Sequence, residues 1–180
     1  MKICAFAFTA VLLLLMMMMM IAVGPADAAD ESADDDAPVV GAVTHLPLPR
    51  FVSMKANTGN ARRGPSLAHR VDWVFKRENM PLEITAEYGN WRRVRDIDGA
   101  GGWMHYALLS GVRTVIVQKD YAALRARPEQ GAEPNAYAEQ GVVAFLGQCR
   151  RDWCEITADG LKGWALRSEL WGIAPDEVRD

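Results

Sequence analysis

An internal repeat constrains the fold of this 180-residue chain more than any other feature of its sequence. Residues 90–94 and residues 152–156 each consist of a turn residue, Trp, two variable residues and an aliphatic residue. In both places the pattern D-G-x-x-G-W then follows, at residues 98–103 and 159–164. The sequence therefore predicts two copies of one structural unit, each about 60 residues long.

Each copy is predicted to consist of short strands that end at Gly, Asn or Asp. The strand candidates of the first copy are residues 71–76, 82–87, 91–96 and 102–105. No long segment has the 3.6-residue period of a helix. We therefore expect an all-β fold of two small barrels or sandwiches. In D-G-x-x-G-W, Asp-Gly is expected to form a hairpin turn, and the second Gly to let the strand bend before the Trp enters the core.

The N-terminal segment has the pattern of an export signal. Lys2 precedes an apolar run, residues 3–23, in which Thr9 is the one polar residue. The small-x-small triplet at residues 26–28 fits a signal-peptidase site, so we expect residues 1–28 to be a signal peptide that is cleaved after Ala28. The alternative is an uncleaved anchor, because 21 residues are enough to span a bilayer. In both cases the rest of the chain is exported, to the periplasm or outside the cell, where disulfides persist.

Residues 29–49 are predicted to be a disordered spacer. Five acidic residues fall within residues 30–36, and three Pro with only scattered aliphatic residues follow. A functional acidic arm is the alternative. The remaining boundaries follow from the repeat, with a first unit at residues 50–112, a second at residues 113–175 and a C-terminal tail at residues 176–180.

Cys149 and Cys154 are the two cysteines that remain once the leader is removed. If residues 151–152 form a two-residue hairpin turn, Cys149 faces Cys154 as a non-hydrogen-bonded pair, at a spacing that suits a disulfide. The corresponding residues of the first copy are Glu87 and Arg92, a complementary cross-strand charge pair. A metal site would need a second group of ligands nearby, and a redox-active pair has the spacing C-x-x-C, so we favour a structural disulfide.

The order and spacing of these motifs resemble the bacterial Src-homology-3-like (SH3b) proteins, in the form with two tandem copies behind a signal peptide. The matching segments are residues 60–66, 81–84, 87–91, 102–103 and 108–111 in the first copy, and residues 149–154, 163–164 and 170–172 in the second. The resemblance implies two small barrels of five to six strands. It also implies binding or targeting modules, often for cell-wall peptide or glycan, without chemistry of their own. The second copy has Arg127-Pro128 where the first has Gly64-Pro65, so ligand binding through that loop is not expected there.

Four residues are candidates for a ligand-binding surface, namely Trp73, Tyr88, Tyr106 and Arg92. Trp73 and Tyr106 have no counterpart in the other copy, whereas four of the six Trp lie at repeat-equivalent positions and are expected to pack in the core or at its rim. Simple packing is the alternative for the candidates as well. Residues 50–113 carry 11 Lys and Arg against 6 Asp and Glu. This basic copy either meets an anionic polymer or lipid headgroup, or is neutralised by the acidic spacer.

The sequence contains neither a free Cys beside a His, nor a nucleophile elbow around a Ser, nor a phosphate-binding Gly loop before a helix. We therefore predict a non-enzymatic protein, without cofactor or metal, that binds peptidoglycan peptide or another component of the cell envelope. The alternatives are a structural or protein-interaction role without a glycan ligand, and an accessory part of a cell-wall hydrolase system. The nearly balanced charge, a net -3, argues against nucleic acid as a partner. A membrane is a partner only if the leader is uncleaved, and the oligomeric state is not predicted.

Overall fold

The structure is a computed structural model that describes residues 39–180. The expected signal peptide and the acidic part of the expected spacer lie outside these residues. Within them the secondary structure consists of β-strands and two three-residue 3-10 helices, so the predicted all-β class is confirmed. No helix in this part of the chain has the length and apolar character needed to cross a bilayer.

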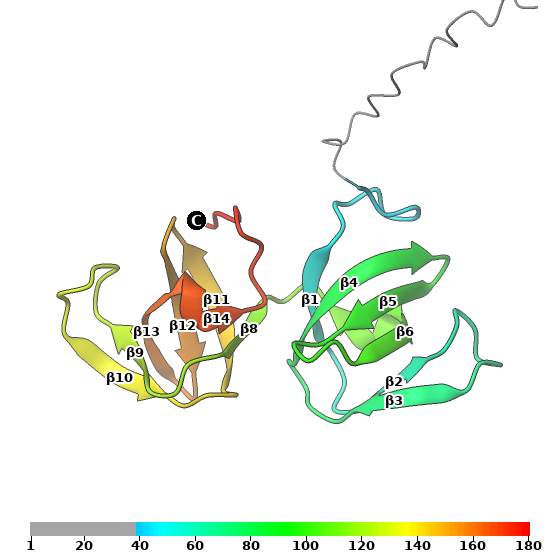
Figure 1. Ribbon diagram of the computed structural model, residues 1–180, viewed down its shortest axis with the longest axis horizontal. Helices are drawn as coiled ribbons and strands as arrows, with labels where there is room; N and C mark the ends of the chain where they lie inside the picture. Colours follow the sequence, from blue (N-terminus) through cyan, green and yellow to red (C-terminus); the bar gives the residue numbers. More distant parts are fainter. Residues whose placement is uncertain (1–38) are drawn as a thin grey trace, which may run out of the picture. The chain divides into compact units, whose positions relative to one another are not determined.

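Seven antiparallel strands form the first module. Their bounds are β1 Arg50–Met54, β2 Gly59–Arg62, β3 Val71–Phe75, β4 Pro81–Tyr88, β5 Trp91–Arg95, β6 Gly101–His105 and, after the 3-10 helix η1 (Tyr106–Leu108), β7 Leu109–Ser110. The order in the sheet is β3-β2-β6-β5-β4-β1-β7 (Figure 1). The four strands predicted for this copy, which are β3 to β6, agree with the structure to within one residue at each end.

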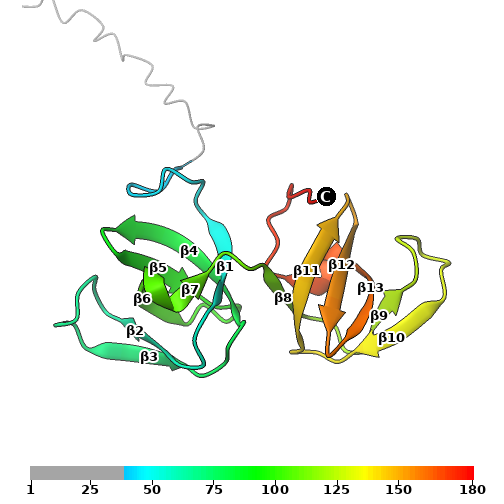
Figure 2. The same ribbon diagram turned by 180° about the vertical axis from the view of Figure 1, so that it is seen from behind.

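Seven further strands repeat this arrangement in the second module. Their bounds are β8 Thr114–Val117, β9 Ala122–Arg125, β10 Pro134–Ala138, β11 Val143–Cys149, β12 Trp153–Ala158, β13 Leu161–Leu166 and, after η2 (Arg167–Glu169), β14 Leu170–Trp171. The order is β10-β9-β13-β12-β11-β8-β14, which is the topology of the first module strand for strand. In both modules a hairpin of the second and third strands extends at one end of the sheet (Figure 2). Two tandem units of one fold are thus confirmed.

Neither sheet closes into the expected barrel of five to six strands. Each is an open, curled sheet of seven strands, whose end strands are not hydrogen-bonded to each other. The additional strand arises because the chain, after the 3-10 helix, returns for two residues beside the first strand of its module. In the first module, Ser110 pairs with Ser53 and Leu109 with Met54 in this way.

Each module has a hydrophobic core of its own. The first core consists of Met54, Ala61, Phe75, Leu82, Ile84, Val94 and Met104. The second is formed by aliphatic residues from the corresponding strands, together with Cys149 and Cys154. Along β5 the burial alternates, because successive side chains of a strand point to opposite faces of the sheet. The face of β4, β5 and β6 that points away from the first core is called the outer face.

Trp103 and Trp164 occupy equivalent positions, but only the second is buried. Trp103 pairs with the exposed Arg93 on β5, and Trp164 pairs with Glu155 on β12. Trp103 is half-buried on the outer face, whereas Trp164 is 8% exposed. The expectation that this Trp enters the core is therefore wrong for the first module, where Met104, the next residue, points into the core instead.

The second Gly of D-G-x-x-G-W serves a close approach of two strands. Gly102 has φ +151, and a Cβ there would lie 2.6 Å from the carbonyl oxygen of Arg62 on the neighbouring strand β2. At Gly163 a Cβ would lie 2.8 Å from the backbone of Leu124 on β9. The sequence interpretation placed a bend before a core aromatic here. In the structure, the glycine is needed because any side chain would push the second strand of the module away.

Residues 39–49, expected to lie in a disordered spacer, pack on the first module. Val40 pairs with Pro47 in a β-bridge, and Leu48 packs against the first core. The Glu87 carboxylate accepts hydrogen bonds from the backbone N–H groups of Val43 and Thr44, in the turn between Val40 and Pro47. From Val39 onward, the structure therefore differs from the predicted spacer.

The C-terminal tail packs on the second module in a comparable way. Arg179 forms a β-bridge with Cys149 at the end of β11. The Arg113 guanidinium, before β8, binds both carboxylate oxygens of Glu177, at 2.6 Å and 2.9 Å. Arg113 corresponds to Arg50 of the first module, which binds Glu87. Each module thus pairs this arginine with a carboxylate, taken from its own sheet in one case and from the tail in the other.

Candidate ligand-binding surface

The β4–β5 hairpin positions two of the four candidate residues. Tyr88 pairs with Trp91 across a two-residue turn, and Glu87 pairs with Arg92 one step further along. The predicted cross-strand charge pair is confirmed, with 3.4 Å between Arg92 Nε and Glu87 Oε1. Arg92 is only 7% exposed, and its guanidinium also donates to the carbonyl oxygens of Gly89 and Trp91. Arg92 is therefore wrong as a surface contact, because its register places it on the face of β5 that points into the module.

Glu87 is the centre of a buried polar network that fastens the N-terminal segment. Its carboxylate accepts from the Thr44 hydroxyl at 2.7 Å, the Thr44 N–H at 2.8 Å, the Val43 N–H at 3.0 Å and the Arg50 guanidinium at 2.5 Å. Burial raises the pKa of this carboxyl, but the hydrogen bonds from Thr44, Arg50 and Val43 outweigh burial and lower the pKa from 4.5 to about 2. Glu87 is therefore a structural anion at neutral pH.

Four rings lie near the β4–β5 turn and the end of β6. They are called here the aromatic group and are Tyr88, Trp91, His105 and Tyr106. Trp91 pairs with His105 across β5 and β6, with ring centroids 5.6 Å apart and the rings at 90°. His105 and Tyr106 have centroids 4.9 Å apart. The Tyr106 N–H donates to the Asn90 carbonyl oxygen and so ties η1 to the hairpin turn. Tyr88 is 65% and Tyr106 52% exposed, so the group offers ring surface to solvent.

Trp73 lies outside the aromatic group. It is on β3, the edge strand, where it pairs with Ala61 of β2. It is 47% exposed and contacts Phe75 edge-on, at 6.4 Å between centroids. Of the four predicted surface residues, the structure therefore places Tyr88 opposite Trp91 and Tyr106 beside the β4–β5 turn. It buries Arg92 beneath the Tyr106 ring at 6.0 Å and leaves Trp73 on the edge strand β3.

The second module has no such group at the equivalent place. Its counterparts are Arg150, Trp153, Leu166 and Arg167, from the registers of β11, β12 and β13. Arg167 donates to the carbonyl oxygens of Ala174, Pro175 and Arg150, at 2.8 Å to 3.0 Å, and to that of Glu177 in the tail. This part of the second module is therefore engaged with the C-terminal tail of its own chain.

The predicted disulfide is confirmed. Cys149 and Cys154 are bonded, and their Cα atoms lie 4.1 Å apart. The Arg150 N–H donates to the Trp153 carbonyl oxygen at 2.8 Å, as the two-residue turn requires. The bond occupies the place that Glu87 and Arg92 hold in the first module, so one register is stabilised by a covalent link in one copy and by an ion pair in the other.

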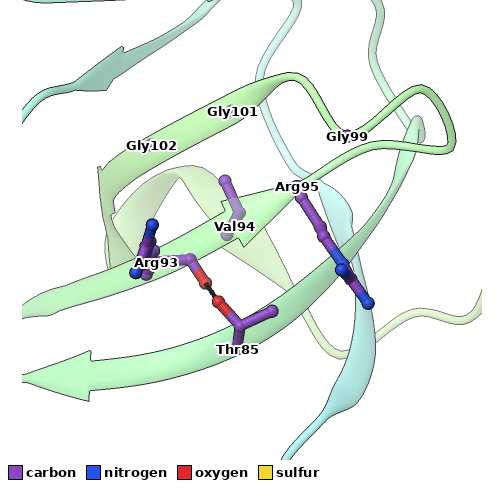
Figure 3. A pocket seen from close by; sticks show the side chains of 7 residues that line it. All are labelled: Thr85, Arg93, Val94, Arg95, Gly99, Gly101 and Gly102. Atoms are coloured by element: carbon purple, nitrogen blue, oxygen red, sulfur yellow. Dashed lines mark hydrogen bonds between the residues drawn. The ribbon is translucent and has the colours of Figure 1, made fainter.

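The outer face of the first module also contains an open hollow of about 480 Å³. Thr85, Arg93, Val94, Arg95, Gly99, Gly101 and Gly102 line it. Figure 3 shows Arg93 and Arg95 leaving the same strand, with the backbone of Gly101 and Gly102 on the neighbouring strand. Arg95 donates through Nε to Glu83, and this ion pair raises the pKa of Arg95. The Arg93 guanidinium has no hydrogen-bond or ion-pair partner among residues 39–180.

Comparison with known proteins identifies the repeated unit. The family model described as bacterial SH3 domain matches residues 55–111 and residues 118–172, which are the two modules. The chain belongs to the bacterial SH3 domain family. Together the matches cover more than half of the chain, and the resemblance read from the motif order is confirmed.

Two solved structures from Trichomonas vaginalis are similar at low identity. Those of NlpC2 and NlpC1 are each 16% identical, with a TM-score of 0.32, and the matches cover 68% and 73% of this chain. The chain spans about half the length of either, 47% and 49%. No curated protein matches the chain.

Trp91, His105 and Arg93 were not among the predicted surface residues. Trp91 was set aside because it has a counterpart in the other copy. The copies differ in what surrounds this Trp, with His105 facing Trp91 where Leu166 faces Trp153. Comparing the neighbours of each repeated Trp would have revealed the aromatic group. Arg93 was not singled out, because the hollow beside it depends on three glycines brought together by the β5–β6 hairpin.

Proposed function

We propose that the protein is exported to the cell envelope and acts there as a non-enzymatic binding protein. Its first module would recognise a peptidoglycan peptide or another envelope component. Export is supported by the apolar leader with its small-x-small triplet and by the disulfide, which persists in oxidising compartments. Binding is supported by membership of the bacterial SH3 domain family.

The aromatic group is the observation that carries this proposal. Tyr and Trp combine a large apolar area with a polar tip and lose little conformational entropy on binding, so they dominate the energetics of many interfaces. Tyr88 and Tyr106 are more than half exposed beside the rigid Trp91–His105 pair. The equivalent place in the second module has one Trp, and its Arg167 is bonded to Glu177 of the tail, so the first module is the better candidate for the ligand.

Co-sedimentation of the mature protein with purified peptidoglycan tests the proposal. The protein should sediment, and the double variant Tyr88→Ala/Tyr106→Ala should bind at least about ten-fold more weakly, because truncating a central aromatic contact costs about 2 kcal/mol or more. Both residues are exposed, so the variant should fold. The matched control is Tyr121→Ala/Tyr137→Ala, which removes two exposed Tyr from the second module and should bind as the wild type does.

Two results would count against the proposal. Failure of the wild-type protein to sediment would favour the alternative of a protein-interaction role without a glycan ligand. Equal loss in the test variant and the control would remove the aromatic group as the binding surface.

A further inference from the structure

The hollow beside Arg93 has the composition of an anion-binding site. Arg93 is exposed and without a partner in the described part of the chain, and Arg95 uses Nε for Glu83, which leaves its two terminal amino groups for other acceptors. Guanidinium groups bind carboxylates and phosphates through parallel N–H donors. Gly101 and Gly102 line the hollow. A Cβ at either glycine would meet the backbone of a neighbouring strand, at the carbonyl oxygen of Val94 or of Arg62, so both positions require glycine.

In the second module, an ion pair between two side chains occupies the place that corresponds to the hollow. Glu155 stands where the first module has Arg93, from its pairing with Trp164, and Lys162 stands where the first module has Gly101. Lys162 Nζ and Glu155 Oε2 lie 3.0 Å apart, so the second module places an internal ion pair there. The first module therefore differs from the second in two ways. Arg93 and Arg95 place two cations on the outer face, and Gly101 across from them has no side chain.

The arginines of the hollow lie on the same face of β5 as Trp91 of the aromatic group. Trp91, Arg93 and Arg95 alternate along β5 and so share the outer face, opposite His105, Trp103 and Gly101 of β6. Trp91 and Arg95 are four residues apart, which corresponds to about 13 Å along a strand. A single extended ligand of that length would reach from the rings to the arginines.

We propose that this hollow binds an oxyanion, a carboxylate or phosphate, of the ligand whose apolar part packs against the aromatic group. The inference rests on the proposed function, and it adds the chemical class of the ligand: a molecule whose anionic group lies about 7 Å (Arg93) to about 13 Å (Arg95) from the part that packs on Trp91. A carboxylate would come from a short peptide, and a phosphate from a polyanionic polymer or a lipid headgroup. Arg93 is the principal contact, with Arg95 at the side of the hollow.

Titration of the mature, isotope-labelled protein with small probes at low ionic strength tests the anion site directly. The probes are N-acetylalanine, which carries one carboxylate, glycerol phosphate, and the neutral N-acetylalaninamide. The amide signals of Gly101 and Gly102 and the Nε–Hε signal of Arg93 should shift with the anions. They should not shift with the neutral amide, and added salt should weaken the effect. The anion that binds more tightly identifies the source, peptide carboxylate or phosphate. No shift with either anion, or equal shifts with the neutral probe, would overturn the proposal.

Arg93→Gln is the decisive variant. It removes the charge without disturbing the buried Glu83, and it should weaken binding of the preferred anion about ten-fold, because a hydrogen bond to a charged group contributes on this order. The matched control is Arg70→Gln, which removes one exposed charge from the same module away from the hollow, beside Asp72. Equal weakening in both variants would mean a general charge effect and would refute the site.

The probe titration separates this inference from the proposed function. Anion binding at Arg93 in a protein that does not sediment with peptidoglycan would support the anion site and overturn the proposed envelope ligand. Sedimentation that Arg93→Gln leaves unchanged, with no response to either anion, would support the proposed function and overturn the anion site.

Discussion

Replacing Glu87 with Gln should release the N-terminal segment from the first module and destabilise that module. The wild-type carboxylate accepts from two backbone N–H groups, the Thr44 hydroxyl and the Arg50 guanidinium, and it faces Arg92 as well. Gln offers one acceptor oxygen in place of two and turns an NH2 donor toward these donors. Removing one partner of a buried charge pair costs about 3–5 kcal/mol, and we expect a loss of this size in the free energy of unfolding at neutral pH.

The pH dependence gives an independent estimate of the same quantity. The pKa of Glu87 is lowered from 4.5 to about 2, so the stabilisation is present above about pH 4.5 and is lost as the pH falls toward 2. At about 1.4 kcal/mol for each pH unit, the shift corresponds to roughly 3 kcal/mol. Gln does not titrate. The difference between wild type and variant should therefore be about 3 kcal/mol near pH 7 and should vanish near pH 2.

Urea unfolding followed by the indole N–H signals of the Trp residues measures this difference for each module separately. Trp73, Trp91 and Trp103 report on the first module, and Trp153 and Trp164 on the second. Trp171 is not used, because its ring contacts Phe51 of β1. The matched control is Glu129→Gln, which removes an exposed carboxylate paired with Arg127 and should change stability by less than about 1 kcal/mol. A Glu87→Gln effect below about 1 kcal/mol near pH 7, or an effect that persists unchanged near pH 2, would refute the reasoning.

Three further outcomes are expected. The variant Cys149→Ser/Cys154→Ser should lower the stability of the second module by about 2 kcal/mol, because the disulfide closes a short loop, and leave the first unchanged in urea unfolding; a loss in both modules would contradict this. Trp164→Ala should lower the free energy of unfolding by about 3–5 kcal/mol, whereas Trp103→Ala should lower it clearly less because this Trp is half-buried. Equal losses in denaturant titrations would contradict the different burial of the two residues. N-terminal sequencing of the envelope fraction should find Ala29 first, and Met1 retained in a membrane pellet would replace cleavage by an anchor.

The repeat predicted much of the fold because it supplied register as well as strands. Aligning Cys149 with Glu87 and Cys154 with Arg92 gave the hairpin pairing in both copies, and the structure confirms it. The same register also indicates that Arg92 is buried. Arg92 and Val94 lie on the same face of β5, so an inward-facing Val94 places Arg92 inward too. A charged residue was assigned to the surface by its type, although its position in the alternation indicates burial.

The packing of residues 39–49 on the first module could not be predicted from the repeat. Glu87 is 44 residues away from Val43, and the contact uses backbone N–H groups, which every non-proline residue has. Composition therefore carries no signal for it. The acidic residues within 30–36 led to a prediction of disorder for the whole of residues 29–49. The hollow beside Arg93 was missed for a related reason, since it depends on the approach of two strands at glycines rather than on a motif.

Chemical-shift mapping on the mature protein with soluble peptidoglycan fragments tests the central claim most directly. We expect shifts of the Trp91 indole, the His105 ring and the Tyr106 amide in the first module, together with the Arg93 Nε–Hε signal if the fragment carries the anion. The second module should not respond. Shifts confined to the second module, or none at fragment concentrations that saturate a known peptidoglycan-binding control, would contradict it.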